Sequence, residues 1–543
     1  MSESRHNFLT QTGLIALCTT ISRVLGVLRD SVSAAFFGAG FIWDAFSFAF
    51  RIPNLFRRLF GEGALSAAFI PVFTEYLERG DQEQTARMAA SVAAMLSAVL
   101  LVLLSLGELG CLLVLKLAPL SDKWELALSL TAVMLPYSFL ICWTAYAGGI
   151  LHSFKHFVAP AVTPIILNAC WILAAWLSSQ AAQDPRTRVF ILAFSILVAG
   201  LFQLALQLRV LRAKGFRLAI RWEPRNPGLR RCMTMLAPII LGLAAFQLNV
   251  LMDGVIAIGL AGSPEGPAHF ALFGRIIRFP LESGANSILY YADRLMQFPL
   301  GVFGIALATA LFPTLATHAA RKNWTEFSDS LRDALSVVFF IGLPASAGMI
   351  VLREPLIKLV FERGAFTPEM TARAADALFA YSCGIWAYCT LHVLIRAFYA
   401  IQDTITPVRV AASMVALNLT LNLILVWIMK ESGMAASTAF SAAMQCVVLI
   451  IIIRRRGRLK LEAGQISCCL KTIVATGVMA LVCVLVRNQI DVGNGSFTGK
   501  LIVVAATLLS GLLVFFVVSI ALRNRTLSII RRLHVSSEKT DGE

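Results

Sequence analysis

The chain has 543 residues, of which 58% are hydrophobic and 14% are charged, and its mean hydropathy is +0.76. A composition this apolar excludes a water-soluble globular protein and indicates an integral membrane protein. The net charge of +16 is explained by basic loops and by attraction to anionic membrane lipids. No basic soluble face suggests binding to nucleic acid.

Apolar segments of about 20 residues, each able to cross roughly 30 Å of hydrocarbon, recur along the chain. We count fourteen of them, at 11–37, 41–75, 88–118, 126–151, 158–179, 188–211, 233–261, 270–317, 329–352, 371–398, 406–429, 433–453, 466–486 and 499–522. The second and the eighth are too long and too interrupted to be single straight helices. The sequence therefore predicts an all-α integral membrane protein with fourteen transmembrane helices.

Lysine and arginine are concentrated in three connections, 212–231, 454–460 and the tail from Arg523. Basic loops of membrane proteins face the cytoplasm. These connections follow the sixth, twelfth and fourteenth apolar segments, so a topology with both termini in the cytoplasm satisfies all three. Arg23 and Arg29 interrupt the first segment, which we therefore expect to remain as a helix and not to be cleaved as a signal peptide.

An internal repeat divides the chain. The sequence AFIPVFTEYLER around Pro71 returns as ALFPTLATHAAR around Pro313, a shift of 242 residues, and each proline follows an arginine, Arg51 or Arg294, by about twenty residues. Parallel repeats of this kind enclose a central cavity in known transporters. We predict two pseudo-symmetric six-helix lobes around a central cavity, followed by two C-terminal helices. The three parts are residues 1–231, 232–462 and 463–543.

The first helix of the second copy is offset by a smaller shift. VLRDSVSAAFFGAG near Asp30 resembles VLMDGVIAIGLAGS near Asp253, at a distance of 223 residues. An insertion of about twenty residues near 262–285 accounts for the difference, and it contains a basic amphipathic stretch with Arg275 and Arg278.

Arginines inside apolar segments are the candidate functional residues. An arginine at the centre of a bilayer costs roughly 3 kcal/mol on insertion scales, so it indicates an anionic ligand or partner. Arg23, Arg29 and Arg294 have no carboxylate three or four residues away, which is the spacing of ion pairs on one helix. Since the planar guanidinium binds phosphate oxygens in pairs, we expect these three, supported by Arg51 and Arg57, to bind a diphosphate in the central cavity.

Carboxylates offer an alternative explanation for the same arginines. Arg58 has Glu62 four residues later, so we expect these two to form a structural or gating pair. Ion pairs that hold the lobes together would likewise account for the other arginines. The acids available for them are Asp30, Asp44, Asp253 and Asp293.

Asp253 and Asp403 form a candidate cation site in the second lobe, because transporters often coordinate sodium or protons with intramembrane acids. Ion pairs with Arg396 or Arg409, or simple exposure of Asp403 at a helix end, remain open as alternatives.

The eleven cysteines contain no C-x-x-C motif, and the histidines show no metal-ligand spacing, so no metal site or cofactor is predicted. No catalytic triad or phosphate loop indicates an enzyme.

Three long motifs resemble the MurJ (MviN) family of lipid II flippases, which belong to the multidrug/oligosaccharidyl-lipid/polysaccharide exporter superfamily. They are SRVLGVLRD at 22–30, WDAFSFAFRIPNLFRRLFGEGALSAAFIPVFTEY at 43–76 and YYADRLMQFPLGVFGIAL at 290–307. The resemblance implies a transporter of the bacterial inner membrane. Its substrate would be lipid II, the undecaprenyl-diphosphate-linked precursor of peptidoglycan, moved from the cytoplasmic to the periplasmic leaflet by alternating access.

The resemblance also implies roles for individual residues. Essential cavity arginines of the family match Arg23, Arg29 and Arg294, its second-span arginine matches Arg57, and its acid matches Asp44. The family's sodium-binding members have an asparagine four residues before the acid of the eleventh span. This chain has Tyr399 before Asp403, so the resemblance does not extend to that ligand.

Energy coupling, partners and rival functions stay open in the sequence. Sodium, protons and the membrane potential are alternative energy sources. We expect a monomer that interacts with cell-wall synthesis proteins. A drug or metabolite antiporter of the same superfamily would favour acidic and aromatic cavity residues, which the many arginines argue against. A non-transporting scaffold for cell-wall enzymes is the third alternative.

Overall fold

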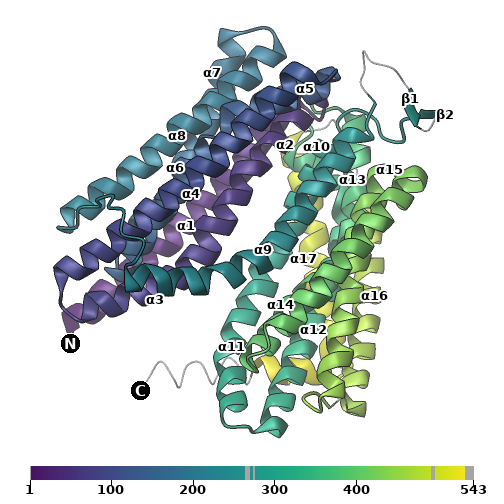
Figure 1. Cartoon of the computed structure of the whole chain (residues 1–543). Coiled ribbons are helices and arrows are strands. Elements are labelled where there is room, and N and C mark those ends of the chain that lie inside the picture. The colour runs from purple at the N-terminus through teal and green to yellow at the C-terminus, as the bar shows by residue number, and fades with distance from the viewer. Residues whose placement is uncertain (1, 263–268, 273–274, 461, 491–495, 532–543) are drawn as a thin grey trace. The chain divides into compact units, whose positions relative to one another are not determined.

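The computed structural model describes residues 2–262, 269–272, 275–460, 462–490 and 496–531 (Figure 1). Packing divides the chain into two units. Unit 1 comprises Met1–Ser287 and Arg363–Phe366, and unit 2 comprises Ile288–Glu362 and Thr367–Glu543. Each unit is a bundle of long helices, as expected where lipid offers the backbone no hydrogen-bond partners.

Unit 1 is built around the packing of α7 on α1 and α8 and of α2 on α5, while α9 packs on α2 and α3. Its helices are α1 (Ser2–Phe37), α2 (Phe41–Phe56), the π-helix η1 (Arg57–Gly63), α3 (Ala64–Glu78), α4 (Gln82–Leu117), α5 (Asp122–Met134), α6 (Tyr137–Ser153), α7 (Val158–Ala181), α8 (Pro185–Ala213) and α9 (Pro227–Gly259).

Unit 2 is built around α12, which packs on α13, α14, α16 and α17. Its helices are α10 (Ala285–Pro299, whose first turn belongs to unit 1), the π-helix η2 (Leu300–Gly304), α11 (Ile305–Ala320), α12 (Trp324–Val360), α13 (Pro368–Ser382), α14 (Ile385–Ala400), α15 (Ile405–Arg455), α16 (Ala463–Gln489) and α17 (Phe497–Ala521).

The second and eighth apolar segments are broken helices, as predicted. A π-helical stretch separates α2 from α3, and another separates α10 from α11. Each stretch contains a Phe-Gly pair, at 60–61 and 303–304, and follows a proline, Pro53 or Pro299. Proline removes a helical hydrogen bond, and widened helical turns often mark functional sites. The two breaks are 243 residues apart in sequence at their Phe-Gly pairs, which agrees with the internal repeat.

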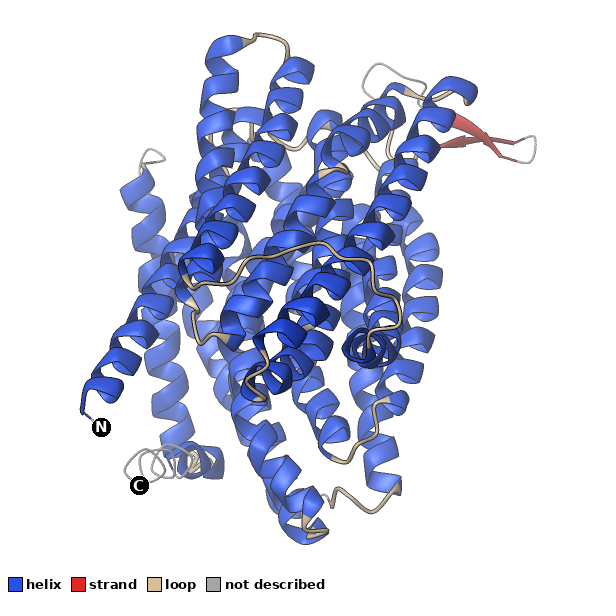
Figure 2. Ribbon diagram, turned by 60° about the vertical axis from the view of Figure 1, so that its left-hand side comes forward, coloured by secondary structure: helices blue, strands red, loops and turns tan. Residues whose placement is uncertain are grey.

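The predicted start of the eighth segment, at residue 270, is wrong. β1 (His269–Leu272) and β2 (Arg275–Arg278) form an antiparallel hairpin, drawn in red in Figure 2, in which His269 pairs with Arg278 and Leu272 with Arg275. This hairpin occupies the predicted insertion near 262–285. Its isoleucines and phenylalanines made the segment look apolar, but Arg275 and Arg278 are exposed.

α15 contains two of the predicted segments, 406–429 and 433–453. The backbone leaves helical geometry at Lys430, where φ is 51° and ψ is −134°. Asn418 Nδ2 donates to Thr438 Oγ1 at 3.4 Å, although residues twenty apart would lie about 30 Å from each other on a straight helix. The chain therefore turns back at Lys430, and its two halves lie side by side.

The chain is a multi-pass membrane protein with an all-α membrane fold. Eight helices in the described ranges are long and apolar enough to cross a membrane, and α13 with α14 would form a ninth span, bent by 43°. The described parts of all fourteen apolar segments are largely helical. The count of fourteen crossings, and the division into 1–231, 232–462 and 463–543, remain predictions.

Candidate functional site

Arg29 is a buried cation in α1, with 7% of its surface exposed. Its Nη2 and Nε donate to Asp30 Oδ1 at 2.7 Å and 3.0 Å, and its Nη1 donates to Asn168 Oδ1 at 3.2 Å. The guanidinium also lies over the ring of Trp171, 4.7 Å from its centroid. Our expectation that no carboxylate on its own helix neutralises Arg29 was therefore wrong.

The spacing rule failed because it considers only residues three or four apart on a helix surface. Arginine has a long, flexible stem, so its guanidinium can bend toward the adjacent residue when both side chains are buried. Burial also strengthens the attraction, since the effective dielectric constant falls away from water.

α7 supplies two residues of this site that sequence reasoning missed, Asn168 and Trp171. Asn168 Nδ2 donates to the carbonyl of Ser22 at 3.1 Å, and Trp171 Nε1 donates to Ser33 Oγ at 2.9 Å. Trp171 makes edge contacts with the rings of Trp43, Phe46 and Phe50. The available signal was an asparagine three residues before a tryptophan inside an otherwise apolar segment.

The other predicted arginines of unit 1 have different surroundings. Arg23 is exposed on α1. Arg51 Nη1 donates to the carbonyl of Val250 on α9 at 3.3 Å, in space left by Gly254, where a Cβ atom would lie 2.7 Å from that nitrogen. Arg57 Nε donates to Asn54 Oδ1 at 3.3 Å. The contact of Arg51 ties α2 to α9, and Arg23 lies on the surface of unit 1.

The predicted pair of Arg58 and Glu62 stays a prediction. Arg58 is exposed, and the side chain of Glu62 lies outside the described residues.

Asp44, expected to take part in substrate binding, is 3% exposed and caps the start of α10. Its Oδ2 accepts from the backbone N–H of Gly284 at 2.9 Å. Its Oδ1 accepts from the N–H and hydroxyl of Ser287 at 2.7 Å and 2.6 Å. A carboxylate is favoured at a helix N-terminus, where backbone N–H groups point outward. Gly284 has φ of +89°, and a Cβ there would lie 1.9 Å from the carbonyl oxygen of Ala39.

Arg294 lies on α10 in unit 2 and is half-buried. Its Nη2 donates to Tyr290 Oη, one helical turn earlier, at 3.2 Å, and its guanidinium lies 4.9 Å from the centroid of that ring. A guanidinium stacked on an aromatic face is stabilised without losing its ability to bind phosphate.

Asp403 forms an ion pair with Arg456, a partner that the sequence did not suggest. Its Oδ2 accepts from Arg456 Nη1 at 2.5 Å, and its Oδ1 accepts from the backbone N–H of Thr406 at 2.9 Å. Partial burial alone would raise the pKa of this carboxyl. The hydrogen bonds from Thr406 and Arg456 outweigh it and lower the pKa to about 2.

The sequence-based alternative that Asp403 pairs with Arg396 or Arg409 was wrong, because Asp403 pairs with Arg456. Asp253 is half-buried on α9.

The structure thus brings Arg29 together with Asp30, Asn168 and Trp171, and Asp44 together with the start of α10. Arg23, Arg51, Arg57 and Asp253 lie in unit 1, whereas Arg294 and Asp403 lie in unit 2. A shared cavity for the arginines, and a shared cation site for Asp253 and Asp403, therefore remain predictions.

Comparison with known proteins places the chain in one family. A family profile described as lipid II flippase MurJ matches residues 33–504. The chain is 35% identical over 454 residues to the probable lipid II flippase MurJ of Vibrio cholerae, covering 81% of this chain and 82% of the relative. It is 32% identical to that of Rhizobium tropici, covering 94% and 93%.

Solved structures agree with this placement at the level of the fold. A lipid II flippase MurJ in an inward closed conformation superposes with a TM-score of 0.74 at 24% identity, covering 94% of this chain and 99% of the other. An inward-facing multidrug resistance MATE transporter gives a TM-score of 0.60 at 15% identity, with 81% and 98% covered. Together with the profile match and the curated relatives, these results show that the chain belongs to the lipid II flippase MurJ family.

Proposed function

We propose that this protein is a lipid II flippase, which moves the undecaprenyl-diphosphate-linked peptidoglycan precursor from the cytoplasmic to the periplasmic leaflet. Besides membership of the family, one observation supports this proposal most. Arg29 is a buried guanidinium within an apolar helix, held by the carboxylate of Asp30 and the amide of Asn168. Intramembrane charges of this kind mark substrate pathways.

Asp30 acts in this mechanism as the anionic partner of Arg29 while no substrate is bound. A guanidinium carries five N–H donors, more than one carboxylate engages, and it binds phosphate oxygens in the same forked geometry. An entering diphosphate therefore takes over part of the role of Asp30. Arg294, stacked on Tyr290, supplies the second cation.

Alternating access follows from charge neutralisation. With the cavity open to the cytoplasm, the arginines repel one another across a region of low dielectric constant, and Asp30 reduces this repulsion only at Arg29. The bound diphosphate removes this repulsion and favours the state in which the cytoplasmic side is closed. The headgroup then leaves toward the periplasm, while the polyprenyl chain stays in lipid throughout.

The membrane setting completes the proposal. The protein resides in the bacterial inner membrane as a monomer with both termini in the cytoplasm, close to cell-wall synthesis proteins. Sodium, protons and the membrane potential remain candidate energy sources, and each charge that crosses 100 mV gains or loses about 2.3 kcal/mol.

Flipping by purified protein in proteoliposomes tests the proposal. We expect Arg29→Ala to lower the initial rate at least ~100-fold, because the diphosphate loses its forked donor, and Arg29→Lys to retain a small fraction of activity. Arg186→Ala is the matched control, since Arg186 is 48% exposed and pairs with Asp122 at a surface. Normal flipping by Arg29→Ala contradicts the role of Arg29. Failure of the unmodified protein to flip the precursor favours the scaffold alternative.

A further inference from the structure

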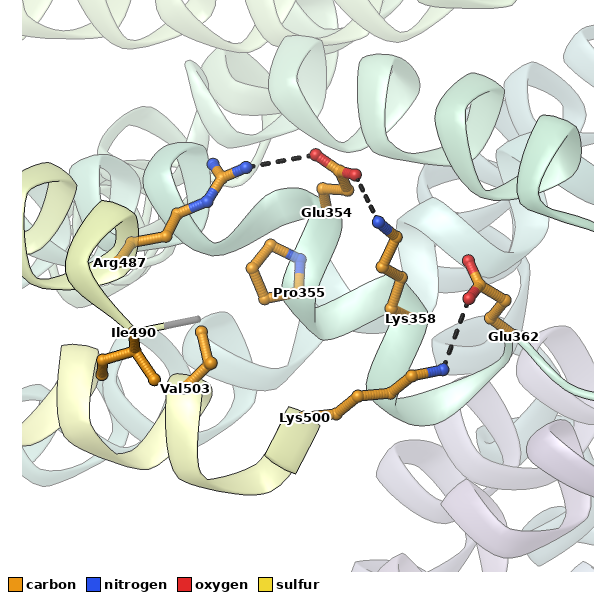
Figure 3. Close-up of a pocket in the computed structure, with 8 residues that line it drawn as sticks. All are labelled: Glu354, Pro355, Lys358, Glu362, Arg487, Ile490, Lys500 and Val503. Atoms are coloured by element: carbon orange, nitrogen blue, oxygen red, sulfur yellow. Dashed lines mark hydrogen bonds and ion pairs between the residues drawn. The ribbon is translucent and has the colours of Figure 1, made fainter. Parts of the chain in front are cut away.

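A charged cavity of about 310 Å³ lies in unit 2, where α12 ends, α16 ends and α17 begins (Figure 3). Five charged side chains line it: Glu354, Lys358, Glu362, Arg487 and Lys500. None of them belongs to the flipping site described above. Their position at the ends of apolar helices places the cavity near one surface of the bilayer, where lipid headgroups lie.

Carboxylates engage the three cations of this cavity. Glu354 accepts from Arg487 Nη2 at 3.1 Å and pairs with Lys358 Nζ at 2.7 Å, and Glu362 pairs with Lys500 Nζ at 3.3 Å. Lys358, Arg487 and Lys500 together carry three positive charges, against two negative charges on Glu354 and Glu362. One positive charge therefore remains in the cavity, and an anion with a single charge neutralises it.

Glu362 adds a second, independent observation. Its Oε1 accepts a hydrogen bond from Lys500 Nζ. Its Oε2 is buried and has no hydrogen-bond partner in the part of the chain that the structure describes. A buried carboxylate oxygen without a donor is costly. A ligand that donates a hydrogen bond to this oxygen would remove the cost.

The wall of the cavity is amphipathic. Pro355, Ile490 and Val503 complete its lining. Next to Arg487 and Lys500 in sequence, Leu485 and Leu501 present 51% and 45% of their surfaces outside the unit, as expected for side chains that face acyl chains. A ligand for this cavity should combine a polar headgroup with hydrocarbon.

We infer that this cavity binds the headgroup of a membrane glycerophospholipid. The phosphodiester carries the single negative charge. Its oxygens accept hydrogen bonds from Lys358, Lys500 and Arg487, because ammonium and guanidinium groups bind phosphate in this way. The ammonium of ethanolamine or a hydroxyl of glycerol donates to Glu362 Oε2. Choline offers no such donor, so phosphatidylcholine binds more weakly. This inference does not depend on the flipping mechanism.

Native mass spectrometry of the whole protein, exchanged into phosphatidylethanolamine, phosphatidylglycerol or phosphatidylcholine, tests the inference. We expect one retained molecule of the first two lipids, several-fold more than of phosphatidylcholine. Lys500→Gln should lower the retained fraction about tenfold, as the loss of one charge-assisted hydrogen bond implies, and Lys500→Arg should preserve it. Glu362→Gln should reduce the preference over phosphatidylcholine. Lys471→Gln is the control, because Lys471 lies near the other end of α16 and contacts Arg523.

Several results would overturn the inference. Retention that Lys500→Gln leaves unchanged, with only a lower melting temperature, would show that the charges merely dock α16 and α17 on α12. A retained mass that matches a polyprenyl phosphate would identify another source of the phosphate, and absence of any retained lipid would remove the site. Flipping by the same Lys500 variants is measured separately, so failure of this site is distinguishable from failure of the flippase proposal.

Discussion

Arg29 in unit 1 and Arg294 in unit 2 are both arginines of apolar helices, but the protein holds them differently. Arg29 is 7% exposed and has a carboxylate, an amide and an indole ring around it. Arg294 is half-buried and lies against the hydroxyl and ring of Tyr290 on its own helix. The difference shows that side chains of α1 and α7 together hold the first cation, whereas the second also stacks on an aromatic ring of its own helix.

The backbone after each repeat-related arginine, in contrast, is similar in the two copies. Arg51 precedes the π-helix η1 by six residues, and Arg294 precedes η2 by the same distance. Arg51 nevertheless donates to a carbonyl of α9, and Arg294 donates to Tyr290 one turn earlier on α10. The two copies therefore share a broken helix and differ in the partner of its arginine.

Asp30→Asn should have the largest effect, because it leaves Arg29 buried without its carboxylate. Breaking a buried pair costs about 3–5 kcal/mol, so we expect a clear fall in melting temperature together with loss of flipping. Asp122→Asn is the control, since Asp122 is 58% exposed in its pair with Arg186. If Asp30→Asn keeps the melting temperature of the unmodified protein, Arg29 does not depend on this carboxylate, and the contrast with Arg294 disappears.

Asp44→Asn should come next. The substitution removes the negative charge from the N-terminus of α10 and weakens the hydrogen bonds to Gly284 and Ser287. Hydrogen bonds to charged groups contribute about 1.5–3 kcal/mol each, but asparagine keeps one acceptor oxygen, so we expect a loss of about 2 kcal/mol. Thermal unfolding in detergent measures this loss. Asp184→Asn provides the comparison, because Asp184 caps α8 at an exposed position. Equal losses in the two variants would refute a special role for buried capping by Asp44.

Arg294→Lys should affect transport more than stability. Lysine keeps the charge but loses the planar fork and much of the stacking on Tyr290. We expect flipping to fall about tenfold, equivalent to about 1.4 kcal/mol, while the melting temperature stays within error. A fall in melting temperature as large as that of Asp30→Asn would show that Arg294 is as dependent on its surroundings as Arg29.

The sequence predicted the membrane class, the helical segments and both broken helices, because hydropathy and glycine or proline breaks are local properties. It named Asp30 only as one of several acids in the alternative reading, since the spacing rule for helix surfaces ignores adjacent buried side chains; the structure pairs Asp30 with Arg29. The roles of Asn168 and Trp171 could not be predicted either, because they depend on α7 packing against α1, more than 130 residues away. The hairpin at 269–278 was mistaken for part of a helix because its apolar residues continue the hydropathy of the segment that follows.

Asp403→Asn should have the smallest effect. The folded-state pKa of about 2 lies below the ordinary value of 3.8. The ion pair with Arg456 therefore contributes its full stability above about pH 4 and loses it only as the pH falls through about 2. Because this pair is partly exposed, its contribution is about 1 kcal/mol or less. The substitution should lower the melting temperature by the same small amount at pH 5 and at pH 8, and it should leave the dependence of flipping on pH unchanged between these values. A change in that dependence would mean that Asp403 gains a proton during transport, which requires a state in which Arg456 and Thr406 no longer hold it.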